Sequence, residues 1–426
     1  MLDINLIRED PKGVQEAAAR RNNPKAVELV TDVLKHDEEW RALKQEVDKL
    51  RHERNTLSVR INEAKKTGKD AGKIILDAKE IPQKLSLAEA RMNELQKLIN
   101  DHLMRIPNIL LDEVPDGKSE ADNKVLKTYG EKRKFDFTPL SHVDLIEKNK
   151  WVDLERAAKI SGARWYFLKG DLARLEMALQ LHAVDLLRAK KYELVVPPFL
   201  MNTEAYSGVT DLGAFSDVLY KIDGEDLHLI ATSEHPLTAQ FKDEVIQNAE
   251  LPIKMAGFST CFRKEAGAHG KDQKGIFRVH QFNKVEQVAI SKPEDSKTLH
   301  AEMLSNAVEF FESLELPFRT LALCSADTGA VSAYTIDLEC WMPAQEAYRE
   351  CVSCSNCTTY QARRLGIKSE DSPGVNRKYV HTLNSTCVAT TRALVAILEN
   401  YQQKDESIEI PKALQKYCGF KKIGGK

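Results

Sequence analysis

The chain has 426 residues, a net charge of −2 and 42% hydrophobic residues, the composition of an ordinary globular protein with room for two or three domains. Eight cysteines in a chain of this length argue against a disulfide scaffold, and no apolar run approaches the roughly 20 residues of a membrane span. The N-terminus has no apolar core typical of a signal peptide, so we expect a cytoplasmic protein that contacts no membrane.

The first predicted element is a pair of heptad-patterned segments between about residues 35 and 106, separated by a polar break with Gly68 and Gly72. This pattern predicts an antiparallel helical hairpin, with Pro82 near the start of its second arm. Periodicity and charge leave two roles open, an oligomerisation coil or a projecting arm whose basic residues contact nucleic-acid phosphates. The predicted seam residues are Trp40, Leu43, Val47, Leu50, Leu57, Ile61, Leu85, Ala88, Met92, Leu95, Ile99 and Ile106.

A linker rich in proline, aspartate and glycine follows the hairpin, and beyond it strand-like runs alternate with helices. We therefore expect an N-terminal domain over residues 1–110 and an α+β domain over residues 111–426, built on an antiparallel sheet with flanking helices. No glycine-rich phosphate-binding loop of the common kinds occurs. Helices are expected over 172–190 and 394–401, and strands over 227–231, 255–263 and 276–290.

The strand predicted at 276–290 has the pattern of a ligand-binding face, because alternate residues of a strand point to the same side. Arginine suits phosphate, an aromatic ring stacks on a base and a carboxylate binds an ammonium group. Arg263 and Glu265 share a face in the same way on the preceding strand. A polar outer face of an ordinary sheet is the alternative interpretation. The residues placed together on the 276–290 strand are Arg278, His280, Phe282, Lys284 and Glu286.

Four cysteines are close together in the sequence, with Cys351, Cys354 and Cys357 in a C-x2-C-x2-C cluster and Cys340 eleven residues before it. A zinc site needs four ligands at such spacings. We nevertheless expect reduced thiols on a strand and the turn after it, and no structural zinc.

The segment Phe262-Arg263-Lys-Glu265, followed after a loop by Phe277-Arg278 through Glu286, resembles motif 2 of class II aminoacyl-tRNA synthetases, and its wording is similar to the seryl-tRNA synthetases in particular. Thr386-Cys-Val-Ala-Thr-Thr-Arg392 lacks the glycine common in bacterial members and is closer to the eukaryotic cytosolic and archaeal type. Lys191 stands where many members have glycine. The resemblance also covers the coiled-coil arm, Ile106-Pro107-Asn108, Pro197-Pro198, Thr232-Ser233-Glu234, Glu350 through Cys357 and Asn384 through Arg392.

This resemblance implies an enzyme that activates L-serine with ATP to seryl-adenylate and transfers serine to the 3′ end of tRNA-Ser and also of tRNA-Sec. It implies catalytic roles for Arg263, Arg278 and Arg392, and a Mg2+ ion held with ATP by Glu350 and Ser353. ATP binding is implied for Arg263, Glu265, Arg278, Val279, Phe282, Glu350, Ser353 and Arg392. Serine binding is implied for Thr232, Glu234, Arg263, Glu286, Asn384 and Thr386.

The resemblance further implies that the coiled-coil arm contacts tRNA, that Lys271 and Lys274 touch its acceptor stem, and that Pro198 belongs to a homodimer interface. The short basic tail at 420–426 is expected to be a disordered end. Two alternatives are a catalytically inactive paralogue that serves as a binding protein, and a class II synthetase for another small amino acid such as threonine. The complete ligand set argues against the first alternative, and the arm and the elements at Thr232 and Asn384 argue against the second.

Overall fold

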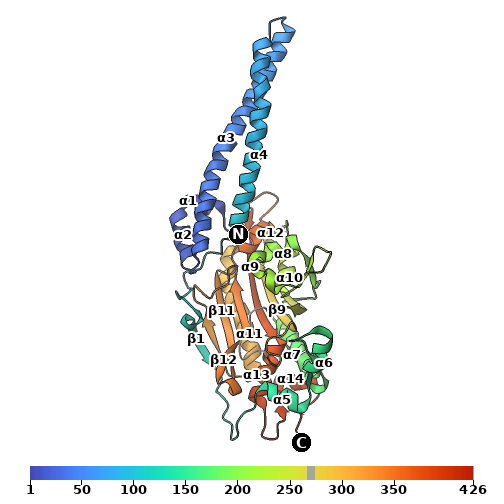
Figure 1. Ribbon diagram of the computed structural model, residues 1–426. Helices are drawn as coiled ribbons and strands as arrows, with labels where there is room; N and C mark the ends of the chain where they lie inside the picture. The colour runs from blue at the N-terminus through green and yellow to red at the C-terminus, as the bar shows by residue number, and fades with distance from the viewer. Residues whose placement is uncertain (266–273, 426) are drawn as a thin grey trace. The chain divides into compact units, whose positions relative to one another are not determined.

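The computed structural model describes residues 1–265 and 274–425 (Figure 1). The chain forms two compact units, Met1–Pro107 and Asn108–Lys426. No helix within the described residues is both long enough and apolar enough to cross a membrane.

The N-terminal unit is helical, and its two long helices lie side by side as an antiparallel pair (Figure 1). The first long helix begins well before residue 35, because Asn23 accepts a hydrogen bond from the backbone of Ala26 and Pro24 occupies the first helical position. The predicted helical hairpin is confirmed. Its helices are α1 (Ile4–Glu9), α2 (Pro11–Ala19), α3 (Pro24–Lys66) and α4 (Gly72–Arg105).

The hairpin is held together by the predicted apolar seam and by ion pairs between the helices. Val47 packs with Leu85 and Ala88, while Arg51 lies 2.8 Å from Glu89 across the pair. The placement of Pro82 near the start of the second arm was wrong. Because α4 already begins at Gly72, Pro82 lies inside the helix, where the long hydrogen-bonded ladder and the buried seam compensate for its missing N–H.

The second unit contains an eight-stranded sheet in the order β1-β10-β11-β12-β15-β9-β8-β4. Neighbouring strands are antiparallel except for the edge pair β4 and β8, which is parallel. The predicted α+β fold with a mainly antiparallel sheet is confirmed. The strands are β1 (Lys124–Tyr129), β10 (Phe318–Ala322), β11 (Tyr334–Met342), β12 (Ala347–Asn356), β15 (His381–Ala389), β9 (Gln281–Ser291), β8 (Ile253–Phe262) and β4 (Glu193–Val195).

Three helices pack against the apolar side of this sheet. Alternate residues of β9 point to that side and to the opposite side. Val285 belongs to the main core, and Gln287 donates to the Met303 carbonyl 3.0 Å away, whereas Lys284 and Glu286 point to the opposite side. The sheet therefore has one face buried under helices and one face available for ligands. The helices are α7 (Gly170–Ala189), α11 (Ser296–Ser313) and α13 (Thr390–Tyr401), with α14 (Lys412–Cys418) against α7.

The strand expected over 276–290 begins only at Gln281, whereas β8 (Ile253–Phe262) agrees with the strand expected over 255–263 to within two residues. At His280 the carbonyl still accepts a hydrogen bond from the Arg263 N–H, but the His280 N–H donates to the Arg164 carbonyl. The His280 ring also stacks on Trp165, and its Nδ1 lies 2.7 Å from the Tyr220 hydroxyl. His280 is thereby drawn away from the ligand face on which the period-2 pattern placed it.

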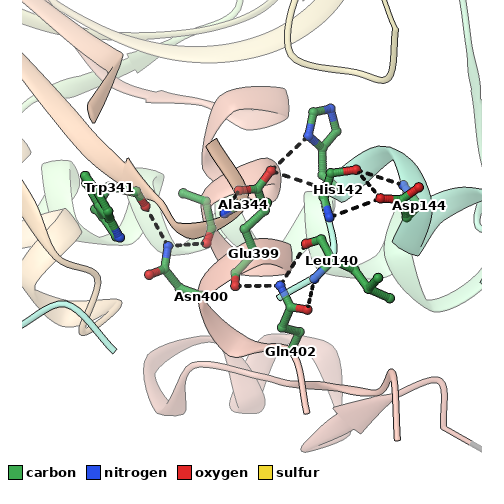
Figure 2. A network of polar contacts seen from close by, with 10 residues as sticks. Leu140, His142, Asp144, Trp341, Ala344, Glu399, Asn400 and Gln402 are labelled. Atoms are coloured by element: carbon green, nitrogen blue, oxygen red, sulfur yellow. Dashed lines mark hydrogen bonds and ion pairs between the residues drawn. The ribbon is translucent and has the colours of Figure 1, made fainter. Parts of the chain in front are cut away.

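A buried polar network anchors helix α13 at its C-terminal end (Figure 2). The Glu399 carboxylate is fully buried, lies 3.1 Å from His142 Nδ1 and accepts N–H groups from the backbones of His142 and Ala344. Gln402 then exchanges hydrogen bonds with both backbone groups of Leu140. These contacts bind α13 to helix α5 (His142–Asn149) and to the turn after β11.

The remaining elements are short, and two of them end the chain. The tail is not a disordered end as expected, because Lys422–Ile423 forms β17, which pairs with β16 (Ile408–Glu409) and buries Ile423. The other short elements are α6 (Leu154–Ser161), α8 (Thr203–Val209), α9 (Leu212–Phe215), α10 (Glu234–Ala239), α12 (Tyr360–Leu365), β2 (Val152–Asp153), β3 (Phe167–Leu168), β5 (Leu200–Asn202), β6 (Leu227–Leu229), β7 (Val245–Gln247), β13 (Lys368–Glu370) and β14 (Lys378–Tyr379).

Candidate active site

The open face of the sheet forms the floor of a cleft of 1130 Å³. Strands β9, β15, β12, β11 and β10 all contribute to its lining, as does Arg263 just after β8, so side chains far apart in the sequence meet there. Every residue to which the family resemblance assigned ATP or serine binding lines this one cleft. These residues are Thr232, Glu234, Arg263, Glu265, Arg278, Val279, Phe282, Glu286, Glu350, Ser353, Asn384, Thr386 and Arg392.

One part of the cleft, here named the arginine end, is made by Arg263, Glu265, Arg278, Phe282 and Arg392. The Arg263 guanidinium lies 5.4 Å from the centre of the Phe282 ring, and its Nε donates to the Ala231 carbonyl. Arg278 Nη1 is 3.5 Å from the Glu265 carboxylate. Guanidinium groups beside an aromatic ring and a carboxylate can hold phosphates, a planar base and its amino group.

The backbone of Glu265 is in the left-handed region, with φ at 47°, a conformation that is uncommon for a residue other than glycine. Arg164 Nη1 donates to the Glu265 carbonyl at 2.8 Å and stabilises this bend. The bend directs the Glu265 side chain into the cleft after β8 has ended. Sequence reasoning missed Arg164, which lies about a hundred positions away and carries no motif signal of its own.

Arg392 is the third residue of α13 and joins that helix to the sheet. Its Nη1 lies 2.7 Å from the Glu350 carboxylate and also donates to the Glu350 carbonyl. The Phe277 ring is approached by Arg392 at 5.5 Å and by Arg349 at 4.9 Å. Two guanidinium groups thus lie near the N-terminus of a helix, whose free backbone N–H groups favour an anion.

An acidic group lies beside Arg392 on β11 and β12. Asp337 is the cross-strand partner of Ser353, and its Oδ1 is buried without a hydrogen-bond partner among the described residues. Burial, and then the neighbouring Glu350 carboxylate, raise the pKa of Asp337 well above its usual range. A buried acceptor of this kind suits a cation. Sequence reasoning missed Asp337, because only the register of β11 against β12 brings it to Ser353.

The other part of the cleft, here named the carboxylate end, contains Thr232, Glu234, Lys284, Glu286, Asn384 and Thr386. Glu286 Oε2 lies 2.5 Å from Lys284 Nζ and accepts a hydrogen bond from the Thr386 hydroxyl at 3.1 Å. Lys284 Nζ also donates to Thr232 Oγ1 at 2.7 Å. Lys284 was placed on this face by the strand pattern but was assigned no role, so the sequence signal existed and was not used.

Glu234 occupies the first position of α10 and lines the same end. Its Oε1 accepts from Gln361 Nε2 at 2.9 Å, and the Gln361 Oε1 in turn accepts from the Thr382 hydroxyl. Burial, and then the nearby Glu286 carboxylate, raise the pKa of Glu234 to about 7. The neighbouring His235 is buried, and burial lowers its pKa to about 3, so its ring is neutral at physiological pH.

Cys351, Cys354 and Cys357 lie on or just after β12 and Cys340 lies on β11, and all four are buried thiols without disulfides. Within residues 1–265 and 274–425, no group of three or more histidine, cysteine, aspartate or glutamate side chains is arranged to hold a metal ion. Of the two lysines expected to touch an acceptor stem, Lys274 is exposed and Lys271 lies outside the described residues.

Comparison with known proteins agrees with this geometry. The family model described as "tRNA synthetase class II core domain (G, H, P, S and T)" matches residues 219–401, and the seryl-tRNA synthetase N-terminal domain matches residues 1–110. The serine–tRNA ligase of Methanoregula boonei is 48% identical over 418 residues, which cover 98% of each chain.

Two solved structures are similar over their full length. Seryl-tRNA synthetase from Pyrococcus horikoshii complexed with ATP has a TM-score of 0.97 and 43% identity, with 100% of both chains covered. The cytoplasmic serine–tRNA ligase from Naegleria fowleri in complex with AMP has a TM-score of 0.91 and 34% identity, covering 100% of this chain and 99% of that one. The predicted kinship with archaeal and eukaryotic forms is confirmed. The chain belongs to the seryl-tRNA synthetase family, the ATP-dependent serine–tRNA ligases of class II.

Proposed function

We propose that this chain activates L-serine with ATP and transfers the serine to tRNA-Ser and tRNA-Sec in the cytoplasm. The observation that carries the proposal is the continuity of the cleft. Arg263 adjoins the Phe282 ring at the arginine end and bonds the carbonyl of Ala231, the neighbour of Thr232, at the carboxylate end. One guanidinium is therefore placed to contact a nucleotide phosphate and an amino-acid carboxylate together.

The activation step requires positioning and positive charge rather than a general base. The serine carboxylate, already ionised, attacks the α-phosphorus, forming the carboxyl–phosphate bond while the bond to the β-phosphate breaks and pyrophosphate leaves. Negative charge develops on the phosphoryl oxygens, so fixed guanidinium groups lower the barrier. We assign contact with the α-phosphate to Arg263, and contacts with the terminal phosphates to Arg278 and Arg392.

At the arginine end, Phe282 and Val279 provide the apolar surface for adenine. The Glu265 carboxylate would accept a hydrogen bond from the adenine amino group. The left-handed backbone at Glu265 supports this assignment, because it directs the side chain into the cleft. A guanine base presents a carbonyl oxygen at the same position and would meet this carboxylate as a second acceptor. We therefore propose that Glu265 selects ATP over GTP.

The residues near Arg392 fit a magnesium ion bound with ATP. Mg2+ is commonly held by one or two carboxylates together with substrate phosphates. Glu350, Ser353 and the buried Oδ1 of Asp337, which has no hydrogen-bond partner among the described residues, offer such a set. When bound, the ion would neutralise phosphate charge. The protein groups would orient the phosphates, with Arg392 held in place by its ion pair with Glu350.

At the carboxylate end, we assign the serine ammonium group to Glu234, Glu286 and Thr232, and the serine hydroxyl to Thr386 with Asn384 nearby. All of these groups line the same part of the cleft. Alanine would leave the hydroxyl partners unpaired in a buried site, which costs a large factor in specificity. In the second step, the 3′-terminal ribose hydroxyl of tRNA attacks the seryl carbonyl, and AMP leaves.

We propose that the helical hairpin provides the tRNA contact. Basic side chains are exposed along α3, and they suit the phosphates of an RNA duplex, which proteins recognise mainly by shape and backbone. Acidic residues are interleaved with them, so the contact is local rather than a uniform basic surface. The exposed basic residues of α3 include Lys44, Lys49, Arg51, Arg54, Arg60, Lys65 and Lys66.

We also propose a homodimer, supported by apolar side chains exposed on the edge strand β4 and on α7. Leu194 and the nearby Val196 are exposed at the sheet edge, and Met177 and Leu181 are exposed on the helix. Exposed apolar groups of this kind mark protein interfaces. Light scattering should give the mass of two chains for the protein, and Leu181→Arg should shift it to that of one, whereas Leu87→Arg on α4 should leave it unchanged.

The reaction is tested by ATP–pyrophosphate exchange with the purified chain. We expect exchange that depends on L-serine and is far weaker with threonine, alanine or no amino acid. Exchange with threonine alone would contradict the assignment of the substrate. Absence of exchange with any amino acid would support an inactive paralogue instead.

A further inference from the structure

Lys284 is buried within the carboxylate end of the cleft, although its side chain carries a charge. It stands on β9 between Phe282 and Glu286, and its side chain is only 6% exposed. Its ammonium group contacts the Glu286 carboxylate and the Thr232 hydroxyl. Burying a charged group is costly unless it is paired, so this arrangement depends on the partners that surround it.

Above pH 7, where the carboxylate form of Glu234 predominates, the charged groups at this end of the cleft balance one another. The carboxylates are those of Glu234 and Glu286, and the neighbouring cations are Lys284 and Arg263. The ring of His235 adds no charge, because burial keeps it neutral. Without Lys284, two carboxylates would face a single guanidinium, and the site would carry an excess negative charge.

A pocket whose positive and negative groups are balanced but lie apart is complementary to a zwitterion, which also has no net charge. The free amino acid presents an ammonium group to the carboxylates and a carboxylate to Arg263. We propose that Lys284 is a specificity-determining residue for the amino-acid substrate, because it balances the carboxylate end so that a zwitterionic amino acid binds better than an amine lacking the carboxylate. This inference rests on the proposed function and adds to it a role for Lys284 in selecting the zwitterionic amino acid.

The hydrogen bonds of Glu286 indicate which neighbouring side chains remain available for the hydroxyl and the ammonium group of serine. Its Oε2 forms the ion pair with the Lys284 ammonium and accepts the hydrogen bond from the Thr386 hydroxyl. The Thr386 oxygen therefore keeps its lone pairs for a hydroxyl donor, which is the group that distinguishes serine from alanine. Glu234, whose Oε1 is bonded to Gln361, is then the carboxylate with greater remaining capacity for the substrate ammonium.

The inference is tested with Lys284→Met, which removes the charge and keeps a side chain of similar length. Two probes are compared in ATP–pyrophosphate exchange, L-serine as substrate and serinol (2-amino-1,3-propanediol) as competitive inhibitor. Serinol has the ammonium group and the hydroxyl but a hydroxymethyl group in place of the carboxylate. We expect the KM for serine to rise and the ratio of serine KM to serinol Ki to increase by roughly tenfold or more, because the negative pocket now favours the cation.

Lys254→Met is the matched control. Lys254 on β8 forms a partly buried ion pair with Glu302 at 3.0 Å and does not line the cleft, so its loss should leave the ratio unchanged. Lys284→Gln is a second variant that keeps N–H donors for Thr232 and Glu286 while removing the charge. It should increase the ratio as Lys284→Met does, and it serves if the methionine variant does not fold.

The outcomes separate this inference from the proposed function. An unchanged ratio in both Lys284 variants, or an equal change in Lys254→Met, would overturn the role of Lys284. If the unaltered protein catalysed no serine-dependent exchange, the proposed function itself would be contradicted. Serine-dependent exchange with an unshifted ratio would leave the function standing and remove only the specificity role.

Discussion

At the residue scale, two carboxylates of the cleft differ in their surroundings although both were expected to bind an ammonium group. Glu286 already contacts Lys284 and Thr386, whereas the only side chain bonded to Glu234 within the described residues is the neutral amide of Gln361. The pKa of Glu234 is raised to about 7 by burial and then by Glu286. The charge of Glu234 therefore changes near neutral pH.

Serine binding should consequently weaken as the solution becomes more acidic. Below pH 7 the neutral form of Glu234 predominates and offers no charge to the serine ammonium, while above pH 7 the carboxylate predominates. The KM for serine should be roughly tenfold higher at pH 6 than at pH 8, as the ionised fraction of a group with this pKa dictates. Initial rates of pyrophosphate exchange measured across this range provide the check.

Glu234→Gln is the control for this pH dependence. The amide does not titrate, so the variant should bind serine more weakly and show a nearly flat KM between pH 6 and 8. The KM for ATP should change little in either protein. A steep serine profile that persists in Glu234→Gln would assign the titration to another group.

Thr386 provides the second prediction at this scale. Thr386→Ala removes a hydroxyl that donates to Glu286 and faces the proposed position of the serine side chain. The loss of hydrogen bonds in a buried site should lower kcat/KM for serine roughly 10- to 100-fold. The KM for ATP should stay within about threefold. Pyrophosphate exchange with each substrate varied in turn measures both values, and an equal effect on the two substrates would contradict the assignment.

At the scale of elements, helix α13 carries Arg392 at its first turn and the Glu399 network near its last (Figure 2). The network ties the helix to α5 and to the turn after β11 through hydrogen bonds to the Glu399 carboxylate. Gly275 lies beside the same network, since a Cβ at this glycine would be 2.3 Å from His142 Nε2. The end of the loop before β9 is thus packed against the group that anchors α13.

Replacement of Glu399 should therefore destabilise the fold. Glu399→Ala leaves the buried N–H groups of His142 and Ala344 without their acceptor and should lower the free energy of unfolding by about 2–4 kcal/mol. Denaturant titration monitored by circular dichroism measures the change. Glu155→Gln is the control, because Glu155 forms an exposed pair with Lys159 and should alter stability by less than about 0.5 kcal/mol. Equal stability of the two variants would refute the anchoring role.

At the scale of the whole molecule, the two units are assigned different tasks. The cleft belongs entirely to the unit that begins at Asn108, and the helical hairpin belongs entirely to the other. If the hairpin serves only to bind tRNA, the activation of serine should not depend on it. The two reactions of the proposed function can therefore be separated by shortening the chain.

The hairpin can be shortened where its helices already adjoin. Arg51 and Glu89 form an ion pair across the two helices, so residues 52–88 can be replaced by a short glycine-containing turn. We expect serine-dependent pyrophosphate exchange to stay within about twofold, and aminoacylation of tRNA-Ser to fall at least roughly 100-fold, because phosphate contacts are lost. Parallel assays of the two reactions give the answer, and loss of both activities would mean that the hairpin is structural.

The strand pattern predicted part of the site and failed at a definable place. Phe282, Lys284 and Glu286 share a face as expected, because β9 is regular from Gln281 onward. His280 precedes that point and is held by Trp165 and Tyr220, which a local pattern does not include. Arg278 also precedes the strand, and it lines the cleft through the path of the loop rather than through the pleat.

The sequence by itself determined the helical hairpin, the family and most of the ligand-facing residues of the cleft, though not Asp337, because heptads, ligand motifs and their order are local properties of the chain. Tertiary structure alone decided which groups pair within the cleft. The register of β11 against β12 brings Asp337 to Ser353, and the approach of the segment at Thr232 to β9 brings its hydroxyl to Lys284. These pairings join residues that are not neighbours in the sequence, 52 positions apart for Lys284 and Thr232. Their charges matter because they are buried, and burial exists only after the chain has folded.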